Sequence, residues 1–190
     1  MARNPETTWN KLNVAMSYFQ KYIETKEDKF ALSIVDLLHV SNFKGGNASI
    51  TEPEEKLCKK LNVYSKKLKD IEKLVGHKKL VELSSKDQEK LIKIAISFLQ
   101  LTKHIDTKIR GFGPSYASAL MYAYFPDVLP VLDRRVLNGA EIEVELDSQK
   151  QVKNIISHYA PLIEAFRKAL LAKRTLSLRQ LDKLWFSKPL

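Results

Sequence analysis

The residues from Ile109 to Ala119 read Ile-Arg-Gly-Phe-Gly-Pro-Ser-Tyr-Ala-Ser-Ala, and this stretch decides how the chain around it folds. Gly111 and Gly113 bracket one apolar residue and can take backbone angles closed to other residues. Pro114 is suited to the first turn of a helix. The pattern predicts a tight hairpin between two helices, at about residues 91–125. The free N–H groups at the start of the second helix would form an anion site that fits a phosphate.

A carboxylate follows this hairpin at a defined distance. Past a Pro-rich loop the chain reads Val-Leu-Asp-Arg-Arg-Val, and Asp133 stands eighteen residues after Ser115. A Gly-x-Gly hairpin followed by an Asp in this way resembles the helix-hairpin-helix DNA glycosylase superfamily, the relatives of endonuclease III, adenine glycosylase and 8-oxoguanine glycosylase. The chain looks nearest to uncharacterised bacterial members. In that family the hairpin grips the DNA backbone beside the target nucleotide.

The resemblance implies a set of roles for individual residues. Asp133 is the expected catalytic residue, and the expected contacts with the DNA backbone are Arg110, Gly111, Phe112, Gly113, Ser115 and Arg134. Bifunctional members of the family carry a Lys where this chain has Ser115, and that Lys attacks the sugar to form a Schiff base. Without an amine there, the resemblance implies a monofunctional enzyme or a relative without catalysis, unless Lys103 or Lys108 substitutes. It also allows a monovalent cation at the hairpin carbonyls, with no other metal and no cofactor.

Asp133 has two interpretations that are compatible with each other. Cleavage between base and sugar passes through a cation-like sugar, which a nearby carboxylate can stabilise, or the carboxylate can orient a water. The simpler interpretation makes Asp133 the N-cap of a helix at 134–138. Arg134 and Arg135 replace the family's usual residues, and they either contact phosphate or pair with Asp133 and lock it away from substrate.

A base that is turned out of the duplex needs a pocket with aromatic faces. The two candidates for that pocket are Phe43 and Tyr116. Phe43 is favoured as a wedge or stacking residue because it lies in a predicted Gly-rich loop at 42–48, although it could equally anchor that loop. Most other aromatic side chains occur at helical spacing and are expected in the core.

Charge and composition favour a polyanionic partner. Lys and Arg number 32 against 22 Asp and Glu, a formal charge of +10, and nine lysines fall between residues 56 and 79. That run fits either a phosphate backbone or a solvated helix face. The single Cys58 excludes an internal disulfide and a Cys-ligated cluster. The chain shows no secretion signal and no apolar run long enough to span a membrane, so we expect a cytoplasmic protein that binds double-stranded DNA.

Hydrophobic periodicity predicts an all-α fold with no strand. Helices are expected at 6–25, at 28–39, in two pieces between 54 and 75 with a break near 61, from 84 or 85 to 101, at 116–125, and at 148–172 with a bend at Pro161. The resemblance implies one glycosylase-like helical bundle over 1–190, possible as two lobes of about 1–82 and 83–190 that share a core. Protein partners are not predicted by any motif.

Three functions fit these observations. The first is a monofunctional DNA glycosylase. The second is a protein on the same fold that binds a DNA lesion or structure without chemistry. The third is a helical module that binds another protein, with the charge serving solubility. Binding through several phosphates should weaken steeply with salt, which separates the first two from the third.

Overall fold

Helices and their connections make up the computed structural model, which describes residues 4–46 and 48–189; within these residues there is no strand, only two isolated bridges. The all-α prediction is confirmed. Asn47, in the predicted loop at 42–48, lies outside the described residues. The elements are α1 (Pro5–Glu24), α2 (Ile34–Phe43), α3 (Glu54–Val75), η1 (Leu80–Glu82), α4 (Ser85–Gln100), α5 (Pro114–Tyr124), α6 (Arg134–Gly139), η2 (Ile155–His158), α7 (Tyr159–Ala172) and α8 (Leu178–Phe186).

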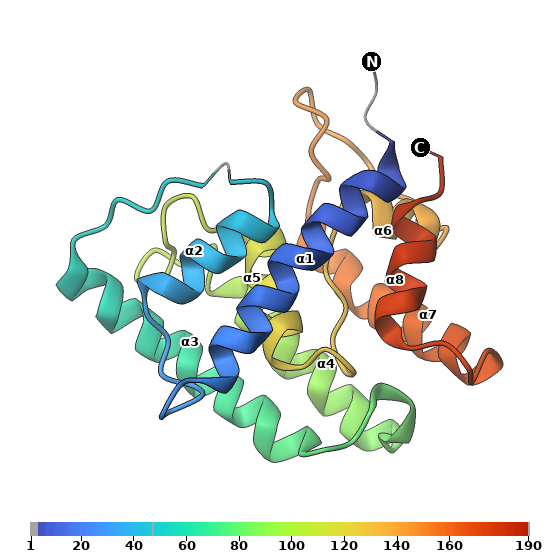
Figure 1. Ribbon diagram of the computed structural model, residues 1–190, viewed down its shortest axis with the longest axis horizontal. Helices are drawn as coiled ribbons and strands as arrows, with labels where there is room; N and C mark the ends of the chain where they lie inside the picture. Colours follow the sequence, from blue (N-terminus) through green and yellow to red (C-terminus); the bar gives the residue numbers. More distant parts are fainter. Residues whose placement is uncertain (1–3, 47, 190) are drawn as a thin grey trace.

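Helix α5 lies at the centre of the arrangement. It packs against α1, α2 and α4, and all of its residues from Ala117 to Tyr124 are buried. Figure 1 shows α1 crossing in front of α5, with α3 and α4 side by side below them. Helices α6, α7 and α8 lie together at the right of this view, away from α2 and α3. Apolar side chains from each of the eight α-helices described join one connected core. The hairpin segment and the segment leading to Asp133 therefore leave the two ends of one buried helix.

Helix α2 begins later than the predicted residue 28, because its start is fixed by a capping box. The Ser33 hydroxyl accepts the N–H of Val35, and the Asp36 carboxylate accepts the N–H of Ser33 at 2.8 Å. Such reciprocal hydrogen bonds satisfy the free donors of a first turn and mark a helix start. The carboxylate also pairs with Lys26 at 2.9 Å and accepts from the Tyr124 hydroxyl at 2.8 Å, which ties this turn to α5.

The predicted break near residue 61 is wrong, since α3 is one continuous helix. Its buried side chains recur at helical spacing along its whole length, so the Lys-rich exposed face and the apolar face belong to a single amphipathic element. These buried residues are Leu57, Leu61, Tyr64, Ser65, Leu68, Ile71 and Val75.

The predicted long helix at 148–172 is also too long. Asn154 has a left-handed backbone, with φ of +47°, and the α-helix begins only at Tyr159. Pro161 therefore lies in the first turn of α7, where its missing N–H would have no partner anyway. The residues before Asn154 are a loop, and this loop forms one wall of the cleft described next.

Candidate functional site

The connection between α4 and α5 spans residues 101–113 and ends in a tight turn. The Phe112 N–H donates to the Ile109 carbonyl at 3.0 Å, and Gly111 has φ of +79°, as in the third position of a type II turn. A Cβ on Gly111 would lie 3.0 Å from the Ser49 carbonyl oxygen. Both the backbone angle and the close neighbour therefore require glycine here. The connection has about the extent left between the predicted helices, which end at 101 and begin at 116, and only its last residues form the tight turn.

Gly113 is different from Gly111, and the expectation that it needs a special backbone angle is wrong. Its φ of −90° and ψ of −177° are extended values that any residue adopts. No heavy atom lies within 4 Å of a Cβ built there, among the residues that the structure describes. Pro114 occupies the first turn of α5, as predicted, and Gly113 is its N-cap without a side-chain hydrogen bond. Neither the backbone angle nor a neighbour among the described residues therefore requires glycine at this position.

The ammonium group of Lys60, on α3, binds the connection that leads into the hairpin. Lys60 Nζ on α3 donates to the Lys108 carbonyl at 2.6 Å and forms an ion pair with Glu52. The same two side chains line an open groove of about 620 Å³ together with Arg110 and residues 111–113. The Phe112 side chain is buried against Tyr64, so only its backbone faces this groove. One hairpin carbonyl is thus already bound to a cation of the chain.

Two serines of α5 position the segment that carries Asp133. The Ser115 hydroxyl donates to the Leu132 carbonyl at 2.8 Å. The Ser118 hydroxyl donates to the Ser115 carbonyl and accepts the Leu132 N–H, both at 2.8 Å. Ser115 stands where bifunctional members of the helix-hairpin-helix family carry their amine, and its side chain is already hydrogen-bonded within the protein. Its hydroxyl holds the backbone of Leu132, the residue before the candidate carboxylate.

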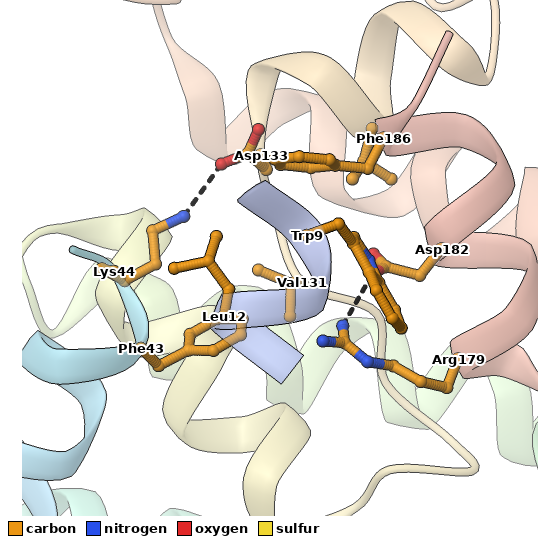
Figure 2. Close-up of a pocket in the computed structure, with 10 residues that line it drawn as sticks. Trp9, Leu12, Phe43, Lys44, Val131, Asp133, Arg179, Asp182 and Phe186 are labelled. Carbon is orange, nitrogen blue, oxygen red and sulfur yellow. Dashed lines mark hydrogen bonds and ion pairs between the residues drawn. The ribbon is translucent and has the colours of Figure 1, made fainter. Parts of the chain in front are cut away.

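Asp133 is the N-cap of α6 and also half of an ion pair. Its Oδ1 accepts the Arg135 N–H at 2.9 Å, and its Oδ2 pairs with Lys44 Nζ at 2.9 Å (Figure 2). Burial alone would raise the pKa of this carboxyl group, but the Lys44 ammonium and the Arg135 N–H outweigh that effect and hold the pKa below its usual value. The carboxylate is therefore ionised at neutral pH, with a quarter of its side chain exposed.

The two arginines after Asp133 do not provide the partner that the sequence suggested. The salt bridge of Asp133 is made by Lys44, while Arg135 contributes its backbone N–H. The Arg134 guanidinium donates to the Lys150 carbonyl at 2.9 Å, and that of Arg135 lies 5.5 Å from the centroid of the Phe186 ring. Both side chains line the same cleft as the carboxylate, and neither forms a salt bridge with it among the described residues.

An open cleft of about 580 Å³ lies in front of Asp133 and gathers positive charge. Its walls come from the start of α5, the start of α6, the end of α2 and the loop before η2. The polar residues that line it are Lys44, Ser115, Tyr116, Asp133, Arg134, Arg135, Gln149, Lys150 and Gln151. Of the predicted site residues, Ser115, Tyr116, Asp133 and Arg134 are brought together here. Arg110, Gly111, Phe112 and Gly113 line the separate hairpin groove.

A second, much smaller pocket lies behind the carboxylate, with about 20 Å³ of free space. Figure 2 shows Trp9, Phe43 and Phe186 around it, with the Arg179 and Asp182 pair on one side. Phe43 is the last residue of α2 rather than part of a loop, and it is only 4% exposed. It therefore forms a wall of this inner pocket and cannot serve as a surface wedge. Lys44, Asp133, Leu12 and Phe186 line both the cleft and the inner pocket.

Sequence reasoning missed Lys44, Arg179 and Asp182. Lys44 stands next to two glycines, which signals an unusual local backbone, but its partner lies 89 residues away. Arg179 and Asp182 occur three residues apart on an ordinary amphipathic helix. Asp182 accepts a hydrogen bond from Trp9, which lies 173 residues earlier in the chain. Within the described residues, no group of three or more His, Cys, Asp or Glu side chains could hold a metal ion.

Comparison of the chain with family models, with curated proteins and with solved structures gave no match. Across residues 4–46 and 48–189, no helix combines the length and the apolar character needed to cross a membrane.

Proposed function

We propose that this protein binds double-stranded DNA and removes a base from its sugar, as a monofunctional glycosylase built on a helix-hairpin-helix glycosylase-like fold. One observation carries the proposal: an ionised carboxylate, Asp133, stands at the wall of a basic cleft that begins at the N-terminus of the helix after the hairpin. Backbone-binding charge and a group suited to glycosidic chemistry thus share one concave surface.

The cleft suits a phosphate backbone. Lys44, Arg134, Arg135 and Lys150 line it, and cationic side chains of this kind supply the sequence-independent part of DNA binding. The hairpin groove adds Arg110, together with the uncapped start of α5 at Gly113, where free N–H groups favour an anion. We assign the DNA backbone to these two neighbouring surfaces.

Asp133 has the charge state that glycosidic cleavage needs. A departing base leaves a sugar with cation-like character, and an ionised carboxylate nearby stabilises that charge or orients the attacking water. Ser115 supplies no amine, and its hydroxyl is engaged with Leu132. A water therefore acts as the nucleophile in this proposal, and the product is an abasic site with an unbroken strand.

The Lys44 ion pair also favours a second candidate function, DNA binding without chemistry. Because Lys44 Nζ lies 2.9 Å from Asp133 Oδ2, the carboxylate already has a counter-charge. For catalysis this pair must open or turn toward the sugar. If it stays closed on DNA, the same cleft binds a lesion or a distorted duplex and leaves every base in place.

The deciding experiment incubates the protein with duplexes that carry one uracil, 8-oxoguanine, hypoxanthine, alkylated purine or mismatch, followed by alkali to cut abasic sites. We expect cleavage of at least one duplex, and a loss of about a hundredfold or more in rate for Asp133→Asn. Asp127→Asn is the matched control, because Asp127 is an exposed carboxylate that lines a groove elsewhere. Salt-sensitive binding without abasic sites on any duplex would favour the second candidate.

A further inference from the structure

Two buried polar atoms at the inner pocket have no hydrogen-bond partner among the described residues: Asp182 Oδ1 and Arg179 Nη2. The other groups of the same side chains are engaged. Asp182 Oδ2 accepts from Trp9 Nε1 at 2.9 Å and from Arg179 Nη1 at 2.6 Å, and Arg179 Nε donates to Asn13 Oδ1 at 2.8 Å. Asp182 is only 3% exposed. Because buried polar groups are nearly always paired, an unpaired acceptor and an unpaired donor on two side chains that are bonded to each other call for a ligand or a water.

The pocket around these two atoms has aromatic and apolar walls. The Arg179 guanidinium covers one face of Trp9, 4.1 Å from its centroid, and lies 5.2 Å from the centroid of Tyr122 and 5.8 Å from that of Phe43. Val131, Leu12 and Phe186 complete an apolar lining. Flat aromatic walls with a few directed polar groups are what a site for an extruded nucleobase requires.

We infer that this inner pocket receives the base turned out of the duplex and selects bases that present one N–H beside a carbonyl oxygen. The inference rests on the proposed function, because the DNA backbone must lie in the adjoining cleft. The base N–H would donate to Asp182 Oδ1, and the carbonyl would accept from Arg179 Nη2. The hydrogen bond from the Arg179 guanidinium involves a charged donor, which makes it stronger than a neutral one.

The hydrogen bonds already present narrow the class of base. Since Asp182 Oδ2 is occupied by Trp9 and Arg179, a single acceptor oxygen is left for the ligand. Uracil, thymine and hypoxanthine match one donor beside one carbonyl. Guanine adds an amino group that would need the second carboxylate oxygen.

The pocket has to open before a base enters. About 20 Å³ is room for one water, and a base is several times larger. Phe186 is the natural gate, because it lines both the cleft and the inner pocket, is only partly buried, and ends the last helix. Displacing its ring toward solvent would join the two spaces beside Asp133.

The test uses three duplexes that differ only in one bulged nucleotide: uracil, adenine, or an abasic analogue. The sugars of the two base-bearing nucleotides are 2′-fluorinated, so that the bases are not lost during the measurement. The protein carries Trp185→Phe, which leaves Trp9 as its single tryptophan reporter. We expect the uracil duplex to bind about tenfold more tightly than the abasic one and to quench Trp9, with adenine behaving like the abasic analogue. Asp182→Asn should abolish the preference for uracil while leaving the affinity for the abasic duplex unchanged.

Each other outcome has a definite meaning. Equal affinity for the three duplexes with unchanged Trp9 emission overturns the inference and leaves a buried water, while DNA binding stands. A preference for adenine overturns the proposed class of base. Failure to bind any duplex at low salt overturns the proposed function as well. If thermal unfolding shows that Asp182→Asn does not fold, Arg179→Lys replaces it, since it keeps the charge and removes Nη2; Asp127→Asn is again the control.

Discussion

Lys44 sets the charge state of Asp133, and this can be measured on a single residue. In Lys44→Met the carboxylate keeps its N-cap hydrogen bond from Arg135 but loses its ion pair. Burial then acts with less opposition, so we expect the pKa of Asp133 to rise. NMR titration of the carboxyl carbon measures this directly. Lys59→Met, which removes an exposed ion pair with Glu55, should leave the titration of Asp133 unchanged.

The same shift predicts a change in acid stability. In the native chain the folded-state pKa of Asp133 lies below its ordinary value of 3.8, so the ionised group stabilises the fold above that value. This contribution is lost as the pH falls through the folded-state pKa. Lys44→Met should therefore lower the unfolding free energy near neutral pH and flatten its decline below pH 3.8. If the unfolding free energy of Lys44→Met falls at low pH as it does in the native protein, the ion pair between Lys44 and Asp133 contributes nothing to stability.

Gly111 provides the second test at the residue scale. Gly111→Ala brings a Cβ to 3.0 Å from the Ser49 carbonyl at a positive φ, and we expect it to cost roughly 1–3 kcal/mol. Gly46→Ala is the matched control, with φ of +76° and no heavy atom of the described residues within 4 Å of its Cβ, so that the difference between the two isolates the contact with Ser49. Gly113→Ala should leave stability within about 0.5 kcal/mol. Chemical denaturation ranks the three, and Gly113→Ala should weaken DNA binding only.

At the scale of elements, α6 and α8 cross closely enough to exclude a methyl group. A Cβ on Gly139 would lie 2.6 Å from the Trp185 Cα and closer still to its carbonyl oxygen. Both are backbone atoms, so the helices would have to separate. We predict that Gly139→Ala lowers the unfolding free energy by about 3 kcal/mol or more, since overpacking a rigid contact costs 1–3 kcal/mol and this clash is severe. Thermal unfolding measures the loss, and a stability equal to the native one would contradict this crossing.

Periodicity was sufficient to predict several elements and failed at particular ends. Helices α1 and α4 follow from apolar residues three and four apart, and Ser84, one of the two predicted caps, is the N-cap of α4. The start of α2 was misplaced because the Ser33 and Asp36 capping box, rather than hydrophobic spacing, decides it. The start of α7 was misplaced because Pro161 fits a first turn as well as a bend.

The site was predictable where its residues follow one another in sequence. The resemblance to the helix-hairpin-helix family points to Asp133, and the structure gives that residue the N-cap position expected from its place before Arg134. The ion pair with Lys44 and the contact between Trp9 and Asp182 join helices far apart in the chain. Such pairs depend on how helices pack in three dimensions, and a single sequence carries no local pattern for them.

At the scale of the whole molecule, the cationic side chains behind the charge of +10 include two groups in very different settings. On α3, lysines such as Lys66 and Lys73 are exposed along the solvent face of an amphipathic helix, and neither lines the cleft. In the cleft, Arg134 and Lys150 flank an ionised carboxylate. A net charge steers polyanions toward a protein from any side, whereas direct phosphate contacts are local.

Two double variants separate these effects, because each lowers the charge by the same two units from +10. Arg134→Gln with Lys150→Gln removes charge from the cleft, and Lys66→Gln with Lys73→Gln removes it from α3. For each phosphate that the protein no longer neutralises, the slope of log K against log salt should fall by about 0.9. We expect a fall of roughly two such steps for the cleft pair and little change for the α3 pair. If the slope of log K against log salt is the same in the two variants, the charge acts as a diffuse field. The proposal that the cleft binds the DNA backbone would then be wrong.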